Sequence, residues 1–429
     1  MRARRASRAW FRLSGRPRKT RTGEMRRMRF CYTDEQSKLK AEVKAFIEEH
    51  VTDELLEELD GSDLGMKLGE KGQAFYREIY KRGWAAVAWP KEYGGQGRSK
   101  FEQYIVEEEF QRIGLRIGGG GTGAPAIIAS GTEEQKRHYV PATIRGEIIF
   151  AQGFSEPGCG TDLAGVQCRA TRDGDEYVIN GQKIYTTAAH IGTHIFLLCR
   201  TDPDSTRHAG LSVLLVPMDT PGITVRPLWT IQKEPSAPRG TTYGEPRTNE
   251  VFFEDVRVPV SVRLGEENDG WNVAQRGLNL DRVGARRYLM SVLRDEDFAN
   301  WIKSDADADE LRADPRVRDT VAQQWTDAQV CRLMTMRSVS IEEQGGNFTY
   351  EGSAEKVWAP EHGVRSAERY GQILGETAQL LNGSPGAVED GIFAHTLLGA
   401  FQSTVNHGSV QVMRDQVARR GLGLPRQPR

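Results

Sequence analysis

The segment SEPGCGTD at residues 155–162, followed by KIYTT at residues 183–187, is the part of this sequence that decides the fold. The first segment has the composition of a tight turn. Gly158 and Gly160 can adopt backbone angles that are closed to other residues, and they let a ligand approach the main chain. Two hydroxyl side chains flank the turn, those of Ser155 and Thr161. We therefore expect residues 155–162 to form a ligand-binding loop.

The second segment has the composition of a β-strand. Residues 177–179 (YVI) and 184–187 (IYTT) are β-type runs, and Asn180-Gly181 between them is a strong signal for a two-residue turn. The pattern predicts a β-hairpin that turns at Asn180-Gly181 and carries KIYTT on its second strand.

Together, the two segments resemble the flavin-binding strands of the acyl-CoA dehydrogenase family, which read roughly T/S-E-P-x-x-G-S/T-D and then N-G-x-K-x-W-I-T. Three further stretches resemble the family: GWAAVAWPKEYGG at 83–95, VFFEDVRVP at 251–259 and LGLPR at 422–426. The resemblance covers about residues 30 to 426.

The resemblance implies an α+β fold of the acyl-CoA dehydrogenase type, and hydrophobic periodicity agrees with it. Thr33 and Gln36 form a capping box before a helical pattern, residues 195–199 and 211–216 are strand-like, and helical patterns return after Gly265. We expect four parts: a basic, disordered arm at 1–29, an N-terminal α-helical domain at 30–150, a middle β-barrel or β-sandwich domain at 151–262 and a C-terminal four-helix bundle at 263–429.

Charge is distributed unevenly along the chain. Residues 1–29 carry a net charge of +11, whereas the remaining 46 basic and 58 acidic residues give a net charge of −12. An acidic body argues against nucleic-acid binding. The arm is Arg-rich like a mitochondrial transit peptide but lacks the apolar stretch of a secretory signal. We interpret it as upstream translated sequence or a tail, with Met25 or Met28 as the more natural beginning.

Cysteine usage and hydropathy indicate the compartment. The five cysteines are scattered, odd in number and free of any Cys-x-x-Cys pair, which argues against a disulfide framework and a zinc site. No apolar run approaches the ~18–20 residues that a membrane helix needs. We therefore expect a cytoplasmic protein with no metal site and no membrane span.

The family resemblance implies an enzyme that uses FAD to convert an acyl-CoA thioester into the 2,3-enoyl-CoA. A base would remove the α-proton while the β-hydrogen leaves as hydride to flavin N5, and electron-transfer flavoprotein would accept the electrons. The family's cofactor-binding positions fall here on Gln152, Phe154, Ser155, Gly160, Thr161, Tyr185, Thr187, Gln372 and Gly375. Tyr185 stands where most members have Trp, so less ring area is available for stacking on the flavin.

Substrate contacts are also implied by position. Thr161 matches the residue that meets the pantetheine or phosphate region of the substrate, Asn279 falls where other members often have Asp facing the acyl-CoA, and Arg282 matches an arginine deep beside the substrate. On a helix, residues 274, 278, 281, 282 and 285 share one face.

The resemblance leaves the catalytic base open. Many members place the base in a Glu-Gly-Thr triplet near the C-terminus, and His407 occupies that Glu position here. A second branch places Glu immediately before the helix arginine, and Asp281 occupies that position. Asp281 is the leading candidate, because a carboxylate in an apolar, substrate-filled pocket becomes a stronger base. His407 is the alternative base or relay. In a third hypothesis the chain has no competent base of its own.

The C-terminal part departs from the family where neighbouring subunits normally meet the flavin. Gln372 and Gly375 match the first half of Q-x-x-G-G-x-G, but Glu376 and Ala378 replace its next two glycines. The R-x-x-F-G pattern is absent after Arg294. Either FAD binding is weakened in a homo-oligomer, or a different subunit completes the site.

Three functional hypotheses therefore stand. The first is an acyl-CoA dehydrogenase working as a homo- or hetero-oligomer, either a dimer or a tetramer. The second is a non-catalytic or half-site partner subunit of a heteromeric dehydrogenase. The third is a flavin oxidase or monooxygenase on the same fold. Residues 232–248 have the composition of a surface loop, which is either a solvated insertion or a lid or subunit contact. The small residues from Gly118 to Ala126 suit either a wide acyl pocket or a packed connection.

Overall fold

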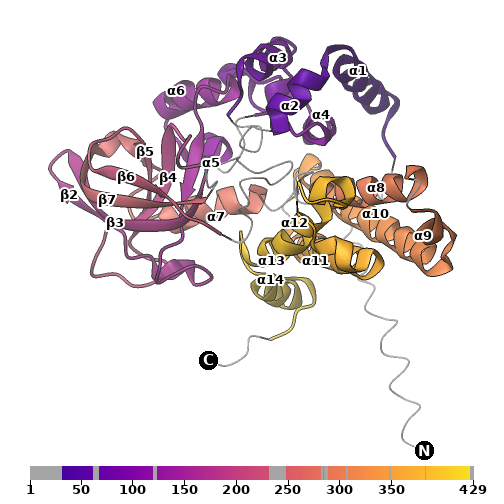
Figure 1. Ribbon diagram of the computed structural model, residues 1–429. Helices are drawn as coiled ribbons and strands as arrows, with labels where there is room; N and C mark the ends of the chain where they lie inside the picture. The colour runs from indigo at the N-terminus through magenta and orange to yellow at the C-terminus, as the bar shows by residue number, and fades with distance from the viewer. Residues whose placement is uncertain are drawn as a thin grey trace, which may run out of the picture.

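The computed structural model describes residues 31–60, 67–118, 123–230, 248–281, 284, 288–305, 308–346, 349–381 and 383–425, with the side chains of residues 60 and 279–281 excepted. A helical N-terminal part, a central β-sheet and a helical C-terminal part follow one another along the chain (Figure 1). The α+β fold expected from the sequence is confirmed. The basic arm, most of loop 232–248 and Arg282 lie outside the described residues.

The first N-terminal helix begins where its sequence signal places it. The capping box is formed, because the Thr33 side chain accepts from the Gln36 backbone N–H at 3.2 Å and the Gln36 side chain accepts from the Thr33 N–H at 3.0 Å. Leu39, Val43 and Phe46, which recur at helical spacing, are the buried residues of the first helix. The helices of this part are α1 (Asp34–His50), α2 (Asp53–Asp60), α3 (Glu70–Lys81), α4 (Lys100–Arg112), α5 (Gly123–Ser130) and α6 (Glu133–Ile144).

The central sheet has the strand order β6-β7-β3-β2-β4-β5-β8, and β1 adds to β4 in parallel. Its strands β4 and β5 are buried along almost their whole length, and α7 (Gly270–Asp281) packs against both of them. The strands are β1 (Phe150–Gly153), β2 (Arg169–Asp173), β3 (Glu176–Thr187), β4 (His194–Arg200), β5 (Leu211–Pro217), β6 (Ile223–Pro227), β7 (Thr248–Pro259) and β8 (Arg263–Leu264).

The hairpin predicted at Asn180-Gly181 is wrong. β3 runs without a turn from Glu176 to Thr187, and it pairs antiparallel with β2 through a turn at residues 174–175. Asn180-Gly181 instead sits at an irregularity in the β3–β7 register. Gly181 is needed for close packing, because a Cβ on it would lie 2.8–2.9 Å from Cys168. Local composition signalled a turn, whereas the proximity of Cys168 comes from the tertiary fold.

The C-terminal helices lie beside the sheet, with α7 placed between the sheet and the helical bundle (Figure 1). α7 packs against β5 so closely that a Cβ on Gly270 would lie 2.4 Å from the Ser212 Cα. The helices of this part are α7 (Gly270–Asp281), α8 (Leu289–Ser304), α9 (Asp309–Ala313), α10 (Pro315–Glu343), α11 (Glu351–Leu374), α12 (Ile392–Gly399), α13 (Gln402–Val405) and α14 (Val410–Gln416).

Glu108 joins the two helical parts through a buried polar cluster. Its carboxylate accepts hydrogen bonds from the Tyr288 hydroxyl at 3.1 Å, from the Lys40 ammonium at 3.2 Å and from the Arg332 Nε at 3.3 Å. Burial alone would raise the Glu108 pKa, but the charges of Lys40 and Arg332 outweigh it and lower that pKa. The cluster therefore fastens α1, α4, α10 and the start of α8 to one another.

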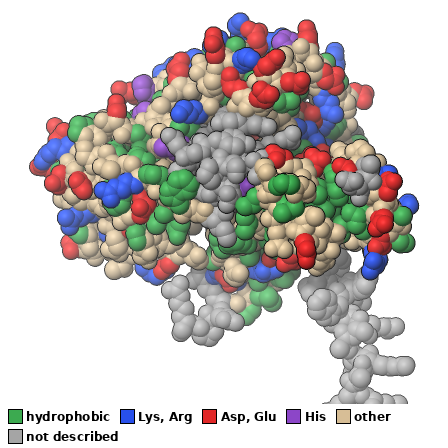
Figure 2. Space-filling view, viewed as in Figure 1, with side chains coloured by type: hydrophobic (Ala, Val, Ile, Leu, Met, Phe, Trp, Pro, Cys, Tyr) green, Lys and Arg blue, Asp and Glu red, His purple; other side chains and the backbone are tan. Residues whose placement is uncertain are grey.

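On the face seen in Figure 2, Asp and Glu side chains gather over the N-terminal helices at the top of the view. Within the described part of the chain, no helix is both long enough and apolar enough to cross a bilayer. The same residues contain no grouping of three or more His, Cys, Asp or Glu side chains placed to hold a metal ion.

Candidate flavin and substrate site

A buried ion pair fixes the SEPGCGTD turn to the sheet. The Lys183 ammonium lies 2.7 Å from the Glu156 carboxylate and donates to the Phe154 carbonyl at 3.1 Å. The Lys183 side chain is fully buried and that of Glu156 is 6% exposed. The Glu156 carboxylate also accepts from the backbone N–H groups of Gln167 and Cys168, at 2.7 and 2.9 Å. The Glu156 carboxylate thus accepts from three donors. One of them is Lys183, so the pair joins the turn to β3.

Sequence reasoning did not assign this pair a role, although both residues stand in the two quoted segments. The available signal was Lys183 itself, a lysine inside an otherwise β-type run. Charged side chains are almost never fully buried unless they are paired, so a partner had to be sought, and Glu156 is the acidic residue of the other segment.

The end of β3 presents an aromatic ring and a hydroxyl to the surface. Tyr185 is 62% exposed, Thr187 is exposed, and Thr186 between them is buried. The β3–β7 register shifts between Lys183 and Thr186, and Tyr185 has a φ of 57°. Left-handed backbone in a bulky residue is strained, and such strain clusters at functional sites. The register shift is what turns the Tyr185 ring outward.

The turn and the strand end lie side by side. The Ile184 backbone N–H donates to the Ser155 carbonyl at 2.9 Å, which places Ser155 next to Tyr185. Ser155 is half-buried, whereas Gly160 and Thr161 are exposed. The end of β3 next to the turn therefore carries the exposed Tyr185 ring, with Ser155 and Thr187 near it. We call Ser155, Gly160, Thr161, Tyr185 and Thr187 the cradle.

The two turn glycines do not act through unusual backbone angles. Neither Gly158 nor Gly160 has a positive φ, so the expected use of angles closed to other residues is wrong. A Cβ added to either glycine would meet no atom within 4 Å. The turn thus leaves open space above its main chain, which is the half of the expectation that the structure supports.

The two predicted contacts from β1 and its end differ in exposure. Gln152 is half-buried and lies opposite Phe196 on β4. The Phe154 side chain is buried, with its ring centroid 5.8 Å from that of Phe196. The Phe154 ring is therefore not available to a ligand at the surface, and the residue is placed near the site only by its position next to Ser155.

The candidate base Asp281 is the last residue of α7. Among the residues of this helix whose side chains are described, Gly270, Val273, Ala274 and Gly277 are buried, and Gly277 is one turn before Asp281. The side chains of Asn279 and Asp281, and all of Arg282, lie outside the described residues. Their roles stay predictions, supported by the placement of α7 between the sheet and the bundle (Figure 1).

The alternative base His407 lies in the C-terminal helices, between α13 and α14. It is half-buried and has a φ of 50°. Lys356 of α11, which is 1% exposed, holds this connection by donating to the Ser403 carbonyl and to the Asn406 side chain, the latter at 3.2 Å. The structure thus fixes His407 in an element separate from the cradle.

The predicted cofactor contacts of the C-terminal part lie at the end of α11. Gln372 is exposed there, and Gly375 ends the helix with a φ of 60°. Glu376 is exposed next to it. All three residues are thus exposed in the single chain, and their contact with a cofactor stays a prediction.

The buried cysteines do not extend the site. Burial raises the pKa of the Cys168 thiol to about 11, and burial also raises the pKa values of Cys159 and Cys199. Thiols with raised pKa values are poor nucleophiles at neutral pH. The chemistry of this region therefore belongs to oxygen donors and the aromatic ring.

Comparison with known proteins identifies the family of the chain. The N-terminal, middle and C-terminal domain models of the acyl-CoA dehydrogenase family match residues 33–147, 151–256 and 268–422, respectively. The chain belongs to the acyl-CoA dehydrogenase family. It is therefore a member of a family of flavoprotein oxidoreductases, and the cradle lies within the middle domain of that family.

Related proteins match this acyl-CoA dehydrogenase over nearly its whole length. Acyl-CoA dehydrogenase FadE26 of Mycobacterium tuberculosis is 33% identical over 414 residues, covering 93% of this chain and 99% of the relative. The solved Tcur3481-Tcur3483 steroid ACAD is 33% identical with a TM-score of 0.80, covering 93% of this chain and all of that chain. The ChsE4-ChsE5 complex from M. tuberculosis is 33% identical with a TM-score of 0.78, at the same coverage.

Proposed function

We propose that this acyl-CoA dehydrogenase removes hydrogen from the α- and β-carbons of an acyl-CoA thioester with FAD as cofactor. The observation that carries the proposal is the cradle, in which a buried ion pair fixes the turn beside an exposed Tyr185 ring. An open aromatic face with adjacent hydroxyls and an unobstructed backbone suits a planar ring with polar edge atoms. When bound, FAD supplies a hydride acceptor that no side chain offers.

The protein's own groups perform three tasks in this proposal. The hydroxyls of Ser155 and Thr187, with the Tyr185 ring, orient the flavin, and Gln372 and Gly375 reach the cofactor of a neighbouring subunit. The Asp281 carboxylate takes the α-proton of the substrate. Arg282 stabilises the negative charge that develops on the thioester as the proton leaves.

We further propose that the active form is a heteromer acting on a bulky acyl-CoA, with electron-transfer flavoprotein as the electron acceptor. Glu376 would place a negative charge towards the flavin diphosphate, which favours completion of the site by a different subunit. Relatives named as a steroid ACAD and as a ChsE4-ChsE5 complex support this reading. A non-catalytic partner subunit is the second candidate, favoured by His407 at the usual Glu position.

A dye-coupled assay with a panel of short, branched and steroid acyl-CoA substrates tests the proposal. The chain is purified alone and co-expressed with candidate partners, and flavin content is measured for each preparation. Asp281→Ala should lose at least about 10²-fold in turnover while keeping its flavin, and His407→Ala should keep most of both. Turnover unaffected by Asp281→Ala would refute the assigned base. Rapid oxygen consumption by the reduced protein would instead indicate an oxidase.

A further inference from the structure

The end of β3, which carries the Tyr185 ring, lies between two residues with left-handed backbone. Tyr185 has a φ of 57° and Ala188 has a φ of 63°, and Thr186 and Thr187 stand between them. Left-handed backbone is unfavourable for a residue that has a Cβ, and it persists only where neighbouring contacts hold it. The segment therefore has little stability of its own and depends on the groups packed beside it.

Asn249 of β7 holds this segment from the neighbouring strand. It lies opposite Thr186, at the point where the β3–β7 pairing resumes after the register shift. The Asn249 Nδ2 donates to the Thr186 carbonyl at 3.2 Å. Asn249 is 1% exposed and Thr186 is fully buried, so water does not compete for this hydrogen bond. A side chain thus ties the strand end to β7 in addition to the backbone ladder.

His190 reaches the same amide from the turn that follows β3. The Ile191 N–H donates to the Ala188 carbonyl at 3.3 Å within this turn, and the His190 Nδ1 lies 3.1 Å from the Asn249 Nδ2. Because a carbonyl can only accept, the Thr186 bond fixes which end of the Asn249 amide carries the hydrogens. The Nδ1 of His190 must then be the acceptor, so the imidazole is neutral and carries its proton on Nε2.

We propose that Asn249 and His190 are positioning residues of the flavin site. Asn249 gives one hydrogen to the Thr186 carbonyl and the other to His190, so His190 orients the amide that holds the strand end. The neighbours of Thr186 on either side are Tyr185 and Thr187, whose side chains belong to the cradle. The pair therefore acts on the ligand through the backbone of β3. This inference rests on the proposed function, in which Tyr185 and Thr187 orient the flavin.

Titration of the full-length flavin-free protein with FAD tests the proposal. His190→Leu removes the acceptor, so the binding-competent strand end should be populated about tenfold less and the apparent FAD affinity should fall by about the same factor. The visible spectrum of the flavin that stays bound should also shift. His190→Asn places its Oδ1 where Nδ1 stood and should restore both. Asn249→Leu removes both bonds and should weaken FAD binding about 100-fold.

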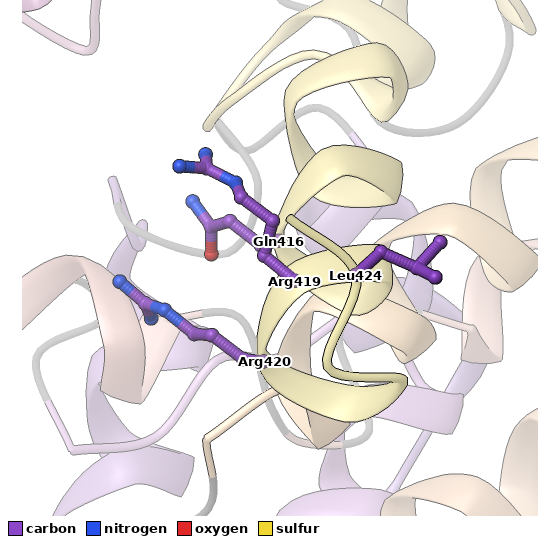
Figure 3. Close-up of a pocket in the computed structure, with 4 residues that line it drawn as sticks. All are labelled: Gln416, Arg419, Arg420 and Leu424. Carbon is purple, nitrogen blue, oxygen red and sulfur yellow. The ribbon is translucent and has the colours of Figure 1, made fainter. Parts of the chain in front are cut away.

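Two controls remove side-chain amides whose hydrogen bonds lie elsewhere. Asn180→Leu is matched within the same two strands, because the Asn180 side chain donates to the Asp255 carboxylate and accepts from the Asp255 N–H, both at 3.0 Å. Gln416→Leu lies outside the sheet. Gln416 accepts from the Ser353 hydroxyl at 2.9 Å and lines a pocket at the C-terminal end of the chain (Figure 3). Both controls should keep the wild-type FAD affinity and flavin spectrum.

Amide hydrogen exchange over residues 183–190 of the flavin-free protein gives a readout that needs no cofactor. His190→Leu should exchange there about tenfold faster than the wild type, and Asn180→Leu should not. Unchanged exchange in His190→Leu would overturn the inference, as would wild-type FAD affinity and spectrum in that variant or a failure of His190→Asn to restore them. A wild type that binds no FAD would count against the proposed function, while faster exchange in His190→Leu would still support its hold on the strand end.

Discussion

The Lys183–Glu156 pair gives the sharpest test of how the cradle is held together. Lys183→Met keeps the length and apolar stem of the side chain but removes its ammonium group. The Glu156 carboxylate, 6% exposed, would then stay buried with only the two backbone N–H donors. Removal of one partner from a buried ion pair costs about 3–5 kcal/mol, so we expect a loss of that size in unfolding free energy.

Urea unfolding followed by circular dichroism measures this loss, and absorbance of the purified protein measures its flavin. Lys81→Met is the matched control, because Lys81 and Glu78 form a pair of the same kind at 2.6 Å with side chains 67% and 38% exposed. Exposed pairs contribute at most about 1 kcal/mol. The double variant Lys183→Met/Glu156→Gln should recover part of the loss, because no unpaired charge remains buried.

Lys183→Met should also release flavin, since the turn that carries Ser155 would no longer be fixed to β3. A loss of stability no larger than that of Lys81→Met would refute the assignment of this pair as the fastening of the cradle. Full flavin content in a strongly destabilised Lys183→Met protein would separate the pair's structural role from cofactor binding.

Two further predictions concern the joints between the parts of the fold. The pKa of Glu108 is lowered in the folded protein. The stability that its carboxylate contributes is therefore present above the ordinary Glu pKa of about 4.3 and is lost as the pH falls through the folded value. Glu108→Gln should flatten the fall in melting temperature below about pH 4, and the same fall as in the wild type would contradict this. Gly270→Ala should lower the free energy of unfolding by about 1–3 kcal/mol in urea, because the new Cβ would lie 2.4 Å from the Ser212 Cα. Gly371→Ala in α11 is the control: apart from the backbone of its own helix, the new Cβ would meet no atom within 4 Å, so this variant should be neutral or stabilising. Equal effects of the two glycine substitutions would show that α7 does not need its close approach to β5.

Local sequence signals predicted much of the fold because their physics is local. The Thr33–Gln36 capping box needs only residues three apart, and the buried stripe of α1 follows from helical spacing alone. Strands β4 and β5 were recognisable as short apolar runs, because they are buried on both faces.

Features that depend on distant residues were missed. Asn180-Gly181 has the composition of a turn, yet the approach of Cys168 makes Gly181 a packing residue inside a continuous strand. The partner of Lys183 is 27 positions away in the sequence, and no periodicity links the two. Within the site, a motif located the cradle residues, whereas the outward turn of Tyr185 follows from a register shift against β7 that only the sheet reveals.

The most direct test of the proposed chemistry is anaerobic addition of an acyl-CoA to the flavin-loaded protein, with its partner subunit present, while the visible absorbance of the flavin is followed. The wild type should lose that absorbance in a single turnover, and Asp281→Ala should keep it although its flavin is bound. Unchanged absorbance of the wild type with every acyl-CoA of the panel would contradict α,β-dehydrogenation by this chain.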